Sequence, residues 1–326
     1  MIDLSIVVAS YETPALLAAC LASIKMSVAA SPSLSIEVIV VDNGSRDESL
    51  ATIKASGLNP NLVARRINRG FASAMNAGIR RAAGRHVLLL NSDVEIASAL
   101  LDAAVARLDA ESSIGILGPA LVHVDGRPQR SIHALPGWAS EFLGDRLARR
   151  LHAVERDHEG TGEMGPWREV EALRGAVLFV RRSLFDDVGL LDESYFFFLE
   201  ETDFCARVRS QGHRIAYCPN LTAQHALGGS SKKRASLATR IEFHRSLYRF
   251  LARRRGVALA RLAFVWRMLR SSVSAVGEMF AGIVVASARA RSAERWGLVL
   301  WHLQGGPAEP GLAKALRETV ADGPTS

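Results

Sequence analysis

Hydrophobic residues in the first third of the chain fall into short continuous runs separated by longer amphipathic segments. The runs cover residues 4–10, 37–43, 62–68 and 86–93. Helical spacing of apolar residues follows Pro14, and a further helical stretch runs from Phe71 to Gly84. Continuous Val, Ile and Leu runs that alternate with helices are typical of a parallel sheet covered on both faces. The pattern predicts an open α/β sheet, with Ser45 and Glu48 forming a capping box before the helix that follows the second strand.

The pattern changes in the middle of the chain, where strands and helices no longer alternate simply. Residues 116–131 predict a strand, an Asp125-Gly126 turn and a returning strand. Strand character resumes at 172–182 and again at 214–220, with a helix between them. We therefore expect the second half of the α/β region to add strands of both directions to the sheet.

Composition is that of a folded protein, with 48% hydrophobic and 22% charged residues. The cysteines, Cys20, Cys205 and Cys218, are far apart and form no CxxC pair. We expect neither a disulfide framework nor a cysteine metal site, and this usage fits a reducing compartment. Because the N-terminus enters an apolar run with no basic segment before it, we also expect no secretory signal.

The net charge of +7 is concentrated in the C-terminal third. Residues 232–295 hold fifteen Lys and Arg against three Glu, a balance of +12 that leaves −5 for the rest. Such a segment indicates a negatively charged partner, either nucleic acid or an anionic membrane surface. Helical spacing over 240–296 favours a basic amphipathic helix on an anionic leaflet, with a solvated surface or an oligomer contact as open alternatives. Residues 271–288 are long enough to cross a bilayer, but Glu278 argues against a span.

Polar residues stand at the ends of all four N-terminal strands. They are Tyr11 and Glu12, then Asp42 to Ser45, Asn68 to Gly70, and Asn91 to Asp93. Ligands of an open parallel sheet bind beyond the carboxyl ends of its strands. A single such residue is usually a helix cap or a turn residue, but four neighbouring strands that end this way predict a binding site.

Six segments of the chain, in order, resemble glycosyltransferase family 2, the inverting nucleotide-sugar enzymes. They are SIVVASYE, VIVVDNGSRDES, NRGFASAMNAGIRRAAG, LLLNSD, RGAVLFVRRSLFDDVGLLDESYFFFLEETD and QHALGGSS. The resemblance implies an α/β GT-A fold, a Rossmann-like mixed sheet with helices on both faces, here followed by a C-terminal helical extension. Within the family the chain is most similar to rhamnosyltransferase-like members acting on polysaccharide or lipid-linked acceptors.

The resemblance also implies a nucleotide site on the first strands. Asp42 looks like the carboxylate that accepts the N3–H of uracil or thymine, for which an acceptor-only group is suited. The alternative is a turn or cap role for this aspartate. The expected nucleotide-binding residues are Ala9, Tyr11, Glu12, Asp42, Asn68, Arg69, Asn76 and Ser92.

Asn91-Ser92-Asp93 resembles the family's DxD motif with Asn in the first place. The resemblance makes Asp93 the main acidic ligand of Mg²⁺ or Mn²⁺, which neutralises the departing diphosphate and takes oxygen ligands from phosphate and water. His225, in QHALGGSS, matches a family histidine that completes the metal shell. The alternatives are an N-cap role for Asp93 and a structural role for His225.

The general base is expected in LEETD, where the family has Glu-Asp-x-Asp. Glu201 falls at the position of the family's catalytic Asp, and Glu200 is the second candidate. Neighbouring carboxylates raise one another's pKa, which suits a base, although acids also favour helix N-termini for structural reasons. Arg174, Gly175 and Asp203 resemble acceptor-side residues.

These assignments divide the chain into a glycosyltransferase domain and an extension. The domain covers 1–230, with a nucleotide-binding half at 1–112 and an acceptor-binding half at 113–230. A basic helical extension covers 231–304, and a disordered tail 305–326. The expected partners are a dTDP- or UDP-sugar and a glycan or lipid-linked acceptor at the cytoplasmic face of the plasma membrane. The rival hypotheses are a non-catalytic nucleotide-sugar binder and a nucleic-acid-binding protein, although no nucleic-acid-binding motif is present.

Overall fold

The computed structural model separates the chain into two compact units. The first unit comprises 1–135, 149–195 and 200–230, and the second comprises 136–148, 196–199 and 231–326. The residues that the structure describes are 1–143, 156–158, 166–226, 236–281, 286–307 and 312. The tail expected to be disordered, 305–326, therefore lies largely outside the described residues.

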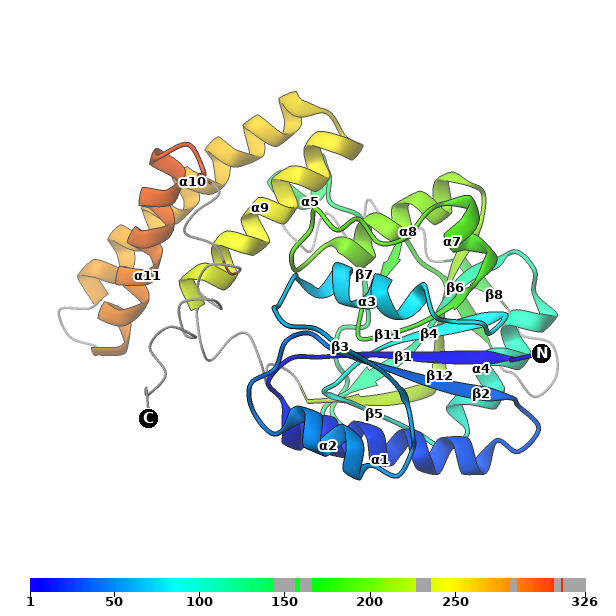
Figure 1. Cartoon of the computed structure of the whole chain (residues 1–326). Coiled ribbons are helices and arrows are strands. Elements are labelled where there is room, and N and C mark those ends of the chain that lie inside the picture. The colour runs from blue at the N-terminus through cyan, green and yellow to red at the C-terminus, as the bar shows by residue number, and fades with distance from the viewer. Residues whose placement is uncertain (144–155, 159–165, 227–235, 282–285, 308–311, 313–326) are drawn as a thin grey trace, which may run out of the picture. The chain divides into compact units, whose positions relative to one another are not determined.

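The first unit is built on a mixed sheet whose parallel part comes from the N-terminal runs (Figure 1). This part has the order β3-β2-β1-β4 and is parallel throughout. Its strands are β1 (Leu4–Ser10), β2 (Ile36–Asp42), β3 (Asn61–Ala64) and β4 (His86–Asn91). The expected parallel α/β core is therefore present, with a third strand shorter than its apolar run.

The sheet continues beyond β4 with strands of both directions, in the order β11-β6-β12-β9-β8. Strand β11 runs antiparallel to both β4 and β6, whereas β6 and β12 are parallel. These strands are β5 (Val94–Ile96), which pairs with β12, β6 (Ile114–Val122), β8 (Arg156–His158), β9 (Trp167–Glu169), β11 (Val177–Arg181) and β12 (Arg214–His225). A small separate sheet pairs β7 (Ile132–His133) with β10 (Ala172–Leu173).

Helices cover both faces of the main sheet (Figure 1). Side chains alternate along β1, so that Ile6 and Val8 join one core cluster and Val7 joins the other. Helices α1 and α4 contribute to the first cluster, whereas α3, α7 and α8 contribute to the second. The helices of this unit are α1 (Pro14–Ala30), α2 (Ser49–Ala55), α3 (Phe71–Ile79), α4 (Leu100–Ala110), α7 (Ser183–Asp187) and α8 (Glu200–Ser210).

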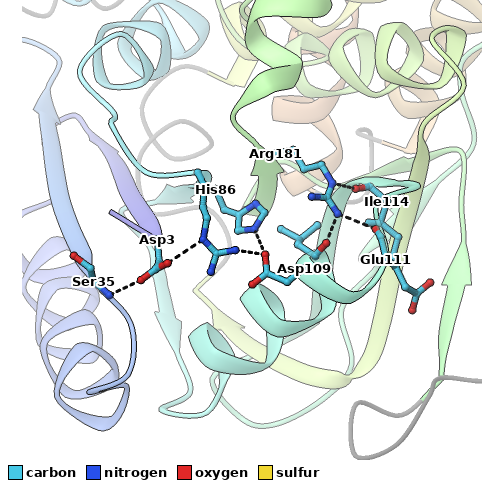
Figure 2. Close-up of polar contacts among 9 residues, drawn as sticks. Asp3, Ser35, His86, Asp109, Glu111, Ile114 and Arg181 are labelled. Carbon is cyan, nitrogen blue, oxygen red and sulfur yellow. Dashed lines mark hydrogen bonds and ion pairs between the residues drawn. The ribbon is translucent and has the colours of Figure 1, made fainter. Parts of the chain in front are cut away.

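The edge of the sheet where β4 begins is held by structural charge pairs (Figure 2). The His86 imidazole lies 2.9 Å from Asp109 on α4, and burial lowers the pKa of His86 despite this carboxylate. Arg85 bonds to both Asp3 and Asp109. Arg181 donates to backbone carbonyls at the end of α4, including that of Glu111 at 2.8 Å. These contacts fasten α4 to the sheet, and the opposite edge is the one that carries the expected site.

Three local expectations are wrong because tertiary contacts override them. Ser45 does not cap α2, which begins at Ser49 without a side-chain cap, because its hydroxyl accepts the N–H of Glu12 at 3.0 Å. Helix α3 ends at Ile79 rather than near Gly84, whose lack of a side chain lets it approach the backbone of β1. The returning strand after the Asp125-Gly126 turn is reduced to one bridge, between residues 122 and 128.

The second unit is helical. It contains α5 (Trp138–Phe142), α9 (Ser236–Arg254), α10 (Val257–Ala281) and α11 (Ala286–Leu303). Arg267 of α10 pairs with Glu141 of α5 at 2.7 Å, and the indole of Trp266 donates to the Glu141 carbonyl at 3.1 Å. Gly256, with φ of +101°, allows the chain to turn between α9 and α10. Within the described part of the chain, no helix has both the length and the apolar character needed to cross a membrane.

Candidate active site

The carboxyl ends of β1, β2 and β4 lie side by side in the parallel sheet. Ser10 at the end of β1 is in register with Asp42 at the end of β2, and Ala9 is in register with Asn91 at the end of β4. The N–H of Asn43 also donates to the carbonyl of Ser10 at 2.8 Å. The structure therefore brings together three of the four polar strand ends singled out in the sequence.

Asp42 is fully buried, and only one of its carboxylate oxygens is used within the described structure. Oδ2 accepts the backbone N–H of Ser45 at 3.1 Å. For Oδ1 the described residues supply no hydrogen-bond donor. Tyr11 and Glu12 follow β1, and Glu12 adopts a left-handed φ of +50° while its N–H binds the Ser45 side chain. Ser45 therefore links the loop after β1 to Asp42, whose Oδ1 can accept a further hydrogen bond.

The segment after β3 is tied to the end of β2 through Asn43, which the strand-end pattern included but the site assignment omitted. Its side-chain N–H donates to Oδ1 of Asn68 at 2.9 Å. Its Oδ1 accepts from the backbone N–H of Arg69 at 3.4 Å and from Arg65 at 3.3 Å. The fourth strand end is thus connected to the other three, and the roles of Asn68 and Arg69 toward a nucleotide stay predictions.

Asn76 is buried in α3, and its side chain is engaged with the protein. Its side-chain N–H donates to the carbonyl of Leu191 at 2.8 Å and to Glu193 at 2.9 Å. Its Oδ1 accepts the N–H of Leu191 at 3.1 Å. These bonds fasten the segment before α8 to α3. A nucleotide-binding role for Asn76 stays a prediction, and the geometry shows an anchoring role.

Asn91, Ser92 and Asp93 lie where β4 ends and the chain turns into β5. The Ser92 hydroxyl is 3.1 Å from that of Thr13 at the start of α1. Oδ1 of Asn91 is buried, and no donor for it is found among the described residues. Thr13 was missed in the sequence because a lone threonine before a helix is an ordinary cap candidate.

Asp93 and His225 face each other across the pairing of β5 with β12. The two strands bring Oδ1 of Asp93 to 3.3 Å from Nε2 of His225, and both side chains are largely buried. The ring Nδ1 of His225 lies 3.1 Å from Oε1 of Gln129. Because that amide oxygen only accepts, Nδ1 carries the hydrogen, and the ring is oriented with Nε2 facing Asp93.

This arrangement fits a divalent cation shared with a phosphate ligand. One carboxylate and one oriented imidazole leave positions for phosphate oxygens and water, which are ligands that Mg²⁺ and Mn²⁺ take. Within the described residues, no group of three or more His, Cys, Asp or Glu side chains could hold a metal by itself. Gln129 was missed because its contact depends on long-range strand pairing, and its amide N–H also donates to His123 at 3.1 Å.

Glu201 lies in the first turn of α8 and packs directly on Gly175. A Cβ added at Gly175 would lie 2.9 Å from Cγ of Glu201, so this close approach requires glycine. Gly175 precedes β11, and the neighbouring Ala176 carbonyl accepts the N–H of Asn91 at 3.0 Å. The expected base and the polar end of β4 therefore belong to the same edge of the sheet.

Burial is the largest influence on the Glu201 carboxyl, and it raises the pKa above its ordinary value. Arg174 and the backbone N–H groups of Thr202 and Gly175 oppose this shift without cancelling it. Oε2 of Glu201 finds no hydrogen-bond donor in the part of the chain that the structure describes. A carboxylate with a raised pKa and an uncommitted oxygen has the properties of a general base.

The backbone before α8 is strained, and α8 itself is firmly anchored. Phe198 and Leu199 have φ values of +70° and +63°, a region that side chains disfavour. Asp203 is buried, and its Oδ2 accepts from Arg207 at 2.9 Å. This ion pair gives Asp203 a structural role. Its contact with the sugar acceptor stays a prediction. Glu200 is buried, with 4% of its surface exposed.

His133 is a further residue beside the site that the sequence did not indicate. Its Nε2 lies 2.9 Å from the hydroxyl of Thr202, the residue after Glu201. Burial lowers the pKa of His133 to about 4, so the ring is neutral at pH 7. The pairing of β7 with β10 places His133 opposite Ala172, just before Arg174. A lone histidine carries no spacing signal, and only the fold reveals this contact.

Comparison with known proteins identifies the relatives of the chain. Residues 5–165 match the family described as glycosyl transferase family 2. Over 236 residues the chain is 28% identical to an N-acetylglucosaminyl-diphospho-decaprenol L-rhamnosyltransferase of Mycobacterium tuberculosis, covering 67% of this chain and 75% of that protein. It is 24% identical over 230 residues to a dTDP-rhamnosyl transferase of Shigella flexneri, covering 69% and 70%.

Solved structures of glycosyltransferases share the fold. A mannosyltransferase of Pyrobaculum calidifontis in complex with GDP-Man and Mn²⁺ aligns with a TM-score of 0.56 at 17% identity, over 92% of this chain and 87% of that chain. GalNAc-T7 with UDP, GalNAc and Mn²⁺ aligns with a TM-score of 0.55 at 14% identity, over 77% of this chain and 48% of that longer chain. At these identities the likeness shows the architecture alone, and the architecture is the GT-A fold.

Proposed function

The chain is a glycosyltransferase that belongs to family 2 and is similar to rhamnosyltransferases, and on that premise we propose an inverting, metal-dependent transfer reaction. The donor is a dTDP- or UDP-sugar, with rhamnose as the sugar, and the acceptor is a hydroxyl of a lipid-linked or polysaccharide glycan. The observation that carries the proposal is the convergence of Asp42, the Asp93–His225 pair and Glu201 on one edge of the sheet.

The nucleobase site follows from Asp42. A pyrimidine imide presents an N3–H that needs an acceptor, and Oδ1 of Asp42 is a buried carboxylate oxygen for which the described residues supply no donor. Tyr11 and Glu12, in the loop bonded to Ser45, are proposed to border this position, and the other proposed nucleotide contacts are Ala9, Asn68, Arg69, Asn76 and Ser92. Uracil and thymine both carry the imide, so this contact accepts dTDP- and UDP-sugars alike.

Asp93 and His225 are the proposed protein ligands of Mg²⁺ or Mn²⁺. Such a cation, when bound, supplies the positive charge that stabilises the departing nucleoside diphosphate. Gln129 holds the His225 ring in the tautomer that offers Nε2. Asn91, two residues before Asp93, adds a buried neutral oxygen to the same edge.

Glu201 is the proposed base, with Glu200 as the second candidate. Its carboxylate takes the proton of the acceptor hydroxyl while that oxygen forms a bond to the anomeric carbon and the diphosphate departs from the opposite side. This single displacement inverts the configuration of the sugar. The raised pKa lets Glu201 bind the proton more strongly than an exposed glutamate does. Arg174, Gly175 and Asp203 are the proposed acceptor-side residues.

The acceptor is proposed from the relatives. The Mycobacterium tuberculosis relative is described as acting on a diphospho-decaprenol-linked sugar, so a lipid-linked acceptor at the cytoplasmic face of the membrane suits this chain. In this proposal, residues 1–112 bind the nucleotide and residues 113–230 bind the acceptor. Residues 231–304 form the basic extension that serves peripheral membrane contact, and 305–326 form its tail.

A donor screen tests the proposal. Thermal unfolding of the protein is followed with a panel of nucleotide sugars, each with and without Mn²⁺. We expect dTDP- or UDP-sugars to raise the Tm only when the cation is present, because ligands stabilise the state that they bind. Stabilisation by purine nucleotide sugars alone, or none by any pyrimidine nucleotide sugar, would refute the proposed donor.

A further inference from the structure

Helix α10 of the second unit has two apolar faces, one of small buried residues and one of large exposed residues. Its small residues Ala260, Ala263 and Ala275 are buried within the helical unit. Six of its large apolar residues point the other way, and Val273 among them is 74% exposed. This exposed face, here called the α10 stripe, consists of Leu262, Val265, Leu269, Val273, Val276 and Phe280.

The α10 stripe is continuous along the helix. Its members recur every three or four residues, which places them on one side of an α-helix. From Leu262 to Phe280 the stripe extends about 27 Å at 1.5 Å per residue. Exposed apolar surface of this extent is uncommon on a soluble monomer and usually marks a contact with another molecule.

Arginines flank the α10 stripe on both sides. At 100° per residue, Arg261 and Arg270 fall on opposite borders of the stripe, and both are exposed. The acidic residues near the helix are already paired: Glu141 binds Arg267, and Glu278 binds Arg295 at 2.9 Å. The charge that the borders of the stripe present to a partner is therefore positive.

We propose that the α10 stripe lies in the surface of an anionic membrane, with its apolar side chains among the lipids and Arg261 and Arg270 at the headgroups. An apolar stripe bordered by arginines has the composition of a helix that lies in the plane of the interface. A two-fold contact between copies of this helix would set positive borders close together, which disfavours that occupant. The inference rests on the proposed function, because a lipid-linked acceptor is reached at a membrane surface.

Vesicle flotation of the full-length protein tests the proposal. Phosphatidylcholine vesicles are compared with vesicles containing about a third phosphatidylglycerol, a strongly anionic surface. We expect the wild type to float only with the anionic vesicles. We expect Leu269→Glu with Val273→Glu to lower the partition coefficient at least about tenfold, since both changes place a charge among lipid chains. Arg261→Gln with Arg270→Gln should lower it about fivefold per arginine.

The matched control is Met26→Glu with Val124→Glu, two exposed apolar residues of the first unit. This variant makes the same change in net charge and replaces exposed apolar side chains that lie outside the α10 stripe. It should float like the wild type. Leu269→Ser with Val273→Ser provides an uncharged version that should also lose binding. Circular dichroism and Tm establish that each variant is folded.

The outcomes separate this inference from the proposed function. Donor binding is measured on the same samples by calorimetry, and we expect the stripe variants to bind donor like the wild type. Donor binding without flotation of the wild type overturns the membrane contact alone, and flotation without donor binding overturns the proposed function alone. Equal loss of flotation in the control, or a dimer that the stripe variants dissociate, would also overturn the inference.

Discussion

Replacement of Glu201 by Gln tests the chemical step, since it keeps the size of the side chain and removes its basicity. The structure packs this side chain against Gly175, with its Cγ 2.9 Å from the position of an added Cβ, so an amide of the same length occupies the same space. General base catalysis contributes about 10²–10⁴-fold, and we expect kcat to fall by that factor, equivalent to about 3–5 kcal/mol in activation free energy. Donor affinity should be unchanged.

The same variant should gain stability at neutral pH. Burial raises the pKa of Glu201, so the ionised carboxylate is less favourable in the folded protein than in the unfolded chain. This cost is present at pH values above the folded pKa and disappears as the pH falls below the ordinary glutamate value. We expect the Tm of Glu201→Gln to exceed that of the wild type at pH 7 and the difference to close in acid. In the wild type, kcat/KM should fall as the pH is lowered, with an apparent pKa above that of an ordinary glutamate.

The assays are product formation with a lipid-linked acceptor, calorimetric donor binding and thermal unfolding across pH. Asp187→Asn, an exposed change of one negative charge on α7, is the matched control and should behave as wild type. Glu200→Gln examines the second candidate. Retention of full turnover by Glu201→Gln would refute the assignment, and loss of turnover only in Glu200→Gln would transfer the role to Glu200.

Three further variants probe the surroundings of the site. Gly175→Ala brings a methyl group into contact with Glu201, and we expect kcat to fall about 10–100-fold with unchanged donor Kd, measured by steady-state kinetics and calorimetry. Gln129→Leu removes the acceptor that orients His225; Mn²⁺ affinity in the presence of donor should fall about 10–100-fold by titration calorimetry, and unchanged affinity would remove Gln129 from the metal site. Asn76→Ala removes the buried bonds that fasten α3 to the segment before α8, and urea unfolding should show a loss of about 2–4 kcal/mol. A stability change below experimental error, together with weaker donor binding, would instead favour nucleotide contact by Asn76.

The parallel part of the fold could be predicted because the evidence is local. Runs such as residues 86–93 are apolar on both faces and end in polar residues, which fixes both the strand and the edge of the sheet where it ends. The capping box predicted at Ser45 is wrong because a tertiary contact competes with the local one. A serine hydroxyl serves either a helix end or a neighbouring loop, and here the N–H of Glu12, far away in sequence, takes it.

The site was only partly predictable because strand pairing brings distant residues together. Asp93 and His225 meet through the pairing of β5 with β12, and no spacing in the sequence encodes that contact. Gln129 and His133 became visible only with the fold, since isolated polar residues near turns are common. Their contacts with His225 and Thr202 are tertiary contacts.

Helix α10 shows a different limit of sequence reasoning. Its periodicity predicts an amphipathic helix but does not say which apolar face is buried. The structure buries the face that carries Ala260 and Ala263, because small residues allow helices to pack closely, and exposes the face that carries Val273. The larger side chains thus remain available for another contact.

Calorimetric titration of the donor with and without Mn²⁺, on the wild type and on Asp93→Asn, tests the central claim most directly. The claim is that the sheet edge binds a pyrimidine diphosphate sugar through a cation held by Asp93 and His225. We expect the wild type to bind a dTDP- or UDP-sugar with Mn²⁺ and at least about tenfold more weakly without it, and we expect Asp93→Asn to lose the dependence on the cation. Equal donor affinity in the two proteins, whether or not Mn²⁺ is present, would contradict the account.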